Sequence, residues 1–82
     1  MEIAKREQLK QDLTEADENI RTAAARIDGR RAAIAERERN GQDVSRDREV
    51  LNLLEATLEL MRRHRDAIAR FLKMIESGHE SG

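Results

Sequence analysis

The second half of the sequence, from Val50 to Ile75, carries two rows of apolar residues at heptad spacing. One row, called here the inner row, consists of Leu51, Leu54, Leu58, Met61, Ile68, Leu72 and Ile75, and is interrupted by Arg65. The outer row consists of Val50, Leu53, Leu60, Ala67, Phe71 and Met74, and is interrupted by Thr57 and His64. Because one apolar stripe lets a helix pack on one neighbour, two stripes predict a central helix with more than one partner.

The first half of the sequence has a single apolar row. Its members alternate steps of four and three residues, which is the pattern of a coiled-coil seam. They are Leu9, Leu13, Ala16, Ile20, Ala23, Ile27 and Ile34, and the charged residue Arg30 occupies one further position of the row. We expect one helix over about residues 3–39. Gly29 could divide this helix in two, but the apolar period keeps the same phase on both sides of it, which favours a continuous helix.

Residues 40–45 separate the two halves. Asn40-Gly41 is typical of a helix C-terminus, and Asp43 or Ser45 can cap the helix that follows. Such a short connection requires the two helices to be antiparallel. The sequence therefore predicts an all-α fold, a single antiparallel helical hairpin over residues 1–82.

The second helix is expected over about residues 46–77. Gly78 is a C-terminal stop signal, so residues 78–82 are expected to form a loose tail. Folding the two helices about the turn pairs residues whose numbers sum to about 85. This register places Arg65 near Asp17, and it leaves the outer row uncovered.

An uncovered row of this length would expose roughly several hundred Å² of apolar surface, which soluble monomers seldom show. The simplest cover is a second copy of the hairpin, which gives a homodimeric four-helix bundle. The alternative is a different protein whose groove accepts the row. The predicted dimer or partner interface comprises Val50, Leu53, Leu60, His64, Ala67, Phe71 and Met74.

The distribution of charge favours an antiparallel dimer. Residues 43–60 contain five acids and two bases, whereas residues 61–73 contain five bases and one acid. Two antiparallel copies of this helix place acids beside bases at both ends. The midpoint of the pairing is expected near Leu60 to His64.

The overall composition excludes several classes of function. The formal net charge of −1 gives no global attraction to nucleic acid or to an anionic membrane. The absence of cysteine excludes disulfides and thiolate metal sites. No run approaches the roughly 18 apolar residues of a membrane span, and the first residues lack the apolar core of a signal peptide. We expect a cytoplasmic protein.

A basic run suggests the main alternative function. Arg62, Arg63 and Arg65 are candidate phosphate contacts, and residues 62–73 could bind RNA or DNA. Consecutive helical residues point to different sides of the helix, however. Phe71, the only aromatic residue, cannot offer a stacking platform by itself. We therefore expect nucleic-acid binding to be the less favoured function.

No catalytic, cofactor or metal site is predicted, and we expect the protein not to be an enzyme. The two histidines, His64 and His79, do not fall in a metal-binding motif. The carboxylates follow helix-surface spacing rather than forming a buried acid–base pair. His64 could instead make self-association sensitive to pH.

Residues 20–72 resemble short bacterial helical-hairpin proteins of unknown function. The residues that match this family are Gly41, Asp43, Leu53, Leu54, Glu55, Leu58, Leu60, His64, Arg65 and Asp66. The resemblance implies an αα-hairpin and no activity. Small plasmid-type RNA-binding dimers of hairpins share the same architecture, which keeps RNA binding as the second possibility. The sequence predicts a structural or protein–protein interaction module that associates through its second helix.

Overall fold

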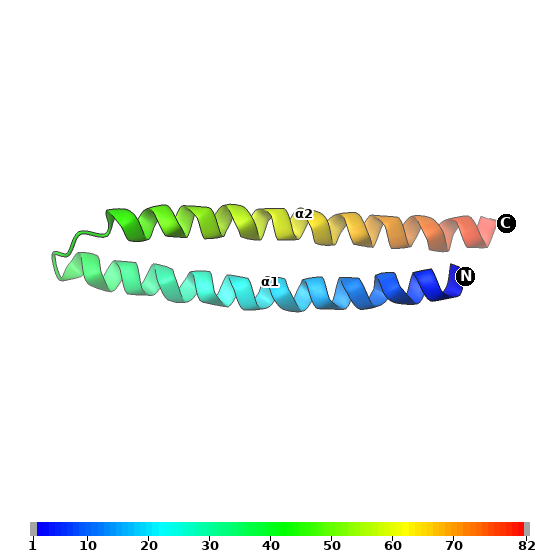
Figure 1. Cartoon of the computed structure of the whole chain (residues 1–82), viewed down its shortest axis with the longest axis horizontal. Helices are drawn as coiled ribbons and strands as arrows, with labels where there is room; N and C mark the ends of the chain where they lie inside the picture. The colour runs from blue at the N-terminus through cyan, green and yellow to red at the C-terminus, as the bar shows by residue number, and fades with distance from the viewer. Residues whose placement is uncertain (1, 82) are drawn as a thin grey trace.

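The computed structural model describes the backbone of residues 2–81 and the side chains of residues 4–78. Helix α1 (Glu2–Arg39) and helix α2 (Ser45–Ser81) lie side by side in opposite directions, with both chain ends at one end of the rod (Figure 1). The hairpin measures 64 × 15 × 15 Å. This confirms the predicted all-α antiparallel hairpin. Among the described residues, no helix is both long enough and apolar enough to cross a membrane.

Helix α1 is continuous through Gly29, as the unbroken apolar phase predicts. A Cβ atom built on Gly29 would meet nothing within 4 Å, so this glycine is not required by close packing. The helix continues because Ile27 and Ile34, on either side of Gly29, are both buried against α2. Packing of the seam therefore outweighs the intrinsic cost of one glycine in a helix, which is about 1 kcal/mol.

The turn between the helices follows the predicted chemistry. Gly41 has φ 74°, the left-handed conformation that ends α1, and the amide of Gln42 donates to the carbonyl of Arg37 at 3.0 Å. The carboxylate of Asp43 accepts from the amide of Ser45 at 3.0 Å and from its hydroxyl at 2.7 Å. These two hydrogen bonds from Ser45 lower the pKa of Asp43. Asp43 thus orders the start of α2, with Ser45 as its donor.

The end of α2 differs from the expectation. The backbone is helical to Ser81, so the loose tail predicted to begin at Gly78 is helical over residues 78–81, while Gly82 lies outside the described residues. Among the described glycines, only Gly41 has a positive φ. A glycine stops a helix when it adopts that conformation, and Gly78 does not.

The core is a thin seam between the two helices. Its buried residues are Ile27, Ile34, Val44, Leu58 and Leu72, each with 3–9% of its surface exposed. Four of the five belong to the single row of α1 or to the inner row of α2. Val44, in the turn, closes one end of the seam and was not predicted to be buried. Arg30, which the heptad pattern placed on the seam, is exposed.

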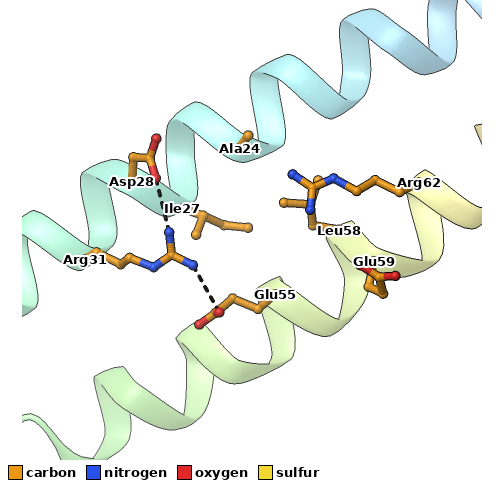
Figure 2. A pocket seen from close by; sticks show the side chains of 8 residues that line it. All are labelled: Ala24, Ile27, Asp28, Arg31, Glu55, Leu58, Glu59 and Arg62. Carbon is orange, nitrogen blue, oxygen red and sulfur yellow. Dashed lines mark hydrogen bonds and ion pairs between the residues drawn. The ribbon is translucent and has the colours of Figure 1, made fainter.

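The register of the hairpin agrees with the prediction. Arg65 donates to Asp17 at 2.8 Å, and Arg31 donates to Glu55 at 3.0 Å (Figure 2). These two ion pairs and the Arg37–Asp47 pair near the turn span about 30 Å along the helices, so the predicted register holds over that part of the 64 Å rod. Helix α1 therefore covers the inner row of α2 and leaves the outer row facing away from it.

Candidate interaction surface

The outer row is the main apolar surface of the described chain. Leu53, Leu60 and Met74 are 69%, 62% and 68% exposed, and Phe71 is 45% exposed. His64 and Ala67 are also exposed, whereas Val50 is half-buried. The structure thus brings the seven predicted interface residues together along one face of α2. It also shows why six of these seven residues are exposed, since a single neighbouring helix can cover only one of the two rows.

Phe71 is the least exposed of the four large residues, and α1 supplies a contact. The ammonium of Lys5 lies 5.8 Å from the centre of the Phe71 ring, which is a cation–π distance. The aliphatic part of such a lysine can shield an aromatic ring from water while its charge stays solvated. Because the side chain of Lys5 is flexible, a packing partner can displace it from the Phe71 ring.

Charged residues without ion pairs flank the outer row at both ends. Within the described part of the chain, Glu49 near one end and Arg70 and Lys73 near the other form no ion pair. Arg70 and Lys73, together with Met74 and Ser77, line an open hollow of about 480 Å³. The outer row therefore has an acidic group at its start and a largely apolar hollow with two cations at its end. The sequence included these three residues among the acids and bases of the second helix, but it did not indicate which charges lack an ion pair.

The three arginines proposed as phosphate contacts do not form one surface. Arg65 lies at the seam, where hydrogen bonds to Asp17 and Asp66 raise its pKa. Arg63 lies 3.7 Å from Glu59 on the exposed side of α2. Arg62 extends over Leu58 between the two helices (Figure 2). They diverge because successive residues of a helix point about 100° apart.

The hollow beside Arg62 is lined mainly by charged side chains, and some of them already form ion pairs with one another. It has a volume of about 320 Å³ and is lined by Ala24, Ile27, Asp28, Arg31, Glu55, Leu58, Glu59 and Arg62. Arg31 bridges Asp28 and Glu55 at 3.2 and 3.0 Å (Figure 2). Three acids against two bases give this hollow no excess of positive charge for a phosphate. The Arg31–Glu55 bridge was not predicted, although the register places the two residues side by side.

The residues that the structure describes contain no group of three or more His, Cys, Asp or Glu placed to hold a metal ion. His64 lies on the outer row, and the side chain of His79 lies outside the described part of the structure. The surface that the geometry singles out is therefore the outer row with its flanking charges. Searches of known protein families, of curated proteins and of solved structures find no match for this chain.

Proposed function

We propose that this chain is a protein–protein interaction module that associates with a second copy of itself through the outer row, forming a four-helix bundle. The observation that carries the proposal is the exposure of Leu53, Leu60, Phe71 and Met74 on one face of α2. A row of exposed apolar side chains on one helix face, even with Thr57 and His64 between them, is typical of an interaction site. The proposal concerns the mode of assembly and names no cellular role.

The thin core of the hairpin supports a second partner. Five residues are buried, and among the described residues no side chain is fully buried. A core in a chain of this size rarely supplies more than about 3–5 kcal/mol, and natural proteins of this size often gain the rest by oligomerisation. This chain contains no cysteine for a disulfide. A second hairpin would add apolar contacts to both α2 helices.

A copy of the same chain fits the face better than an unrelated occupant. A two-fold arrangement lets one surface serve as both partners, and it is the commonest closed assembly. The acidic start and basic end of the outer row are complementary to each other, so the surface is complementary to itself in the antiparallel direction. Nucleic acid is the less favoured partner, because Arg62, Arg63 and Arg65 diverge and two of them are paired with acids.

The test is the mass in solution, measured by size-exclusion chromatography with light scattering. The wild-type chain is expected at about twice its 9.4 kDa mass. Leu60→Glu and Phe71→Glu are each expected to give monomers that stay helical, because both residues are exposed within a single hairpin. Asn52→Glu is the matched control: it adds the same charge to an exposed position of α2 that belongs to neither row.

Two results would overturn the proposal. One is a wild-type chain that stays monomeric at the highest attainable concentration. The other is a Leu60→Glu chain that stays dimeric, which would place the interface elsewhere. Absorbance at 260 nm in the same experiment reports on nucleic acid, because a chain without Trp or Tyr absorbs little in this range. Bound nucleic acid lost on Arg62→Glu would favour the alternative function.

A further inference from the structure

The structure also indicates how two copies would be arranged. We infer that the two α2 helices pair antiparallel along their outer rows, with the two-fold axis at the level of residue 62. In this arrangement Glu49 of each copy lies near Arg70 and Lys73 of the other. The inference rests on the proposed self-association, and it adds to the antiparallel direction a defined register and a specific pair of charges.

The extent of the outer row sets the register. The row begins at Val50 and ends at Met74, so only a pairing that places these two residues side by side buries the whole row on both copies. The axis then falls midway, at the level of residue 62. Leu53 faces Phe71 of the second copy, which matches a leucine with the only aromatic ring. Val50 of one copy faces the open hollow beside Met74 of the other.

The division of charge along α2 sets the direction. Five acids and two bases lie between Asp43 and Leu60, and five bases and one acid lie between Met61 and Lys73. An antiparallel pairing brings the acidic half of each helix to the basic half of the other. A parallel pairing brings like charges together at the same levels, which is destabilising. Complementary charge thus favours the antiparallel direction independently of the apolar contacts.

The ion pairs within one hairpin show which charged residues of α2 are already paired and which could pair with a second copy. Glu55 and Asp47 are already paired with Arg31 and Arg37 of α1, whereas Glu49, Arg70 and Lys73 form no ion pair within the described chain. In this register Glu49 lies level with residue 75 of the second copy. Arg70 of that copy is five residues away, which is about 7–8 Å along the helix axis. Two long side chains can span this distance. Exposed pairs of this kind contribute little affinity, so their role here is to select direction and register.

Spin-label distances test the direction. Because the chain has no cysteine, Asn52→Cys and Arg63→Cys each provide a single labelling site outside the outer row. In the antiparallel arrangement the two labels at position 52 are displaced by roughly 30 Å along the axis, and those at position 63 by about 3 Å. The distance measured by double electron–electron resonance is therefore expected to be much longer at position 52 than at position 63.

The same measurement separates the two proposals. Equal short distances at both positions in a chain of dimeric mass would mean a parallel pair, which refutes this inference and leaves self-association intact. A longer distance at position 63 than at position 52 would refute the register. A monomeric mass with no distance between labels would refute self-association itself, and the inference with it.

Charge reversal tests the specific pair. Glu49→Arg and Arg70→Glu are each expected to raise the dimer Kd about two- to five-fold, and the double variant is expected to restore it. Arg62→Glu serves as the control, because Arg62 lies over the seam on the other side of α2, and it is expected to leave the Kd unchanged. A double variant weaker than either single variant would show that these two residues are not neighbours in the dimer.

Discussion

Ile27→Ala is the substitution for which the structure predicts the largest loss of hairpin stability. Ile27 is 3% exposed, the most buried of the described apolar residues, and it lies beside Leu58 in the seam (Figure 2). Deleting a buried isoleucine to alanine costs about 2–5 kcal/mol, and less where neighbours or water can fill the space. The seam opens to solvent on both sides, so we expect a loss of about 2–3 kcal/mol. This is about 40% or more of the roughly 3–5 kcal/mol expected of such a core.

The loss should be measured by urea unfolding, followed by circular dichroism at 222 nm, in the Leu60→Glu background so that association makes no contribution. The urea midpoint is expected to fall by about 40% or more, with an unchanged slope. Leu53→Ala in the same background is the matched control: it also removes a large apolar side chain, but Leu53 is 69% exposed, so the change should stay within about 0.5 kcal/mol. If Ile27→Ala costs less than about 1 kcal/mol, or if both variants lose the same stability, the seam is not the source of the fold's stability.

Three further predictions concern the backbone and the turn. Gly29→Ala should raise the stability by about 1 kcal/mol and the Tm by roughly 4–8 °C, because the new Cβ meets nothing within 4 Å in the middle of a helix; a lower Tm in a thermal melt would contradict a continuous α1. Gly41→Ala should destabilise by about 1–2 kcal/mol, since φ is 74° there, and Gly41→Asn should lose less in the same urea experiment. The hydrogen bonds from Ser45 lower the pKa of Asp43 in the folded protein. The ionised carboxylate therefore stabilises the fold at pH values above its ordinary pKa of 3.8, and this stabilisation is lost as the pH falls through the lowered pKa of the folded state. The stability difference between wild type and Asp43→Asn should therefore be present at neutral pH and shrink in strong acid, and a difference independent of pH would show that the ionised carboxylate is not what orders the turn.

The sequence was sufficient for the parts of the fold that depend on periodicity. The single row of the first helix, the inner row of the second and the six-residue connection together imply an antiparallel hairpin in one register, and that register brings Arg65 to Asp17. The unbroken phase also predicted that α1 would continue through Gly29. These features could be predicted from the sequence because each depends on many residues acting together.

Features that depend on local geometry were harder to predict. Gly78 has the composition of a stop signal, but a glycine permits the left-handed conformation without requiring it, and the helix continues. The burial of Val44 depends on how the turn closes over the end of the seam. The Arg31–Glu55 bridge depends on which side-chain conformations are chosen among several acids and bases. The exposure of the outer row, in contrast, followed from counting two rows against one neighbouring helix.

The placement of both chain ends at one end of the rod has a mechanical consequence (Figure 1). A force that pulls these ends apart acts across the seam rather than along it, so it separates one pair of facing residues at a time. The hairpin should therefore open as a zipper, from the ends toward Gly41, at a low and nearly constant force, releasing up to about 3.5 Å of chain per residue freed. A force applied along the seam, between the turn and either end, would load many contacts at once and meet greater resistance. The same thin fold is thus compliant in one direction and stiff in another.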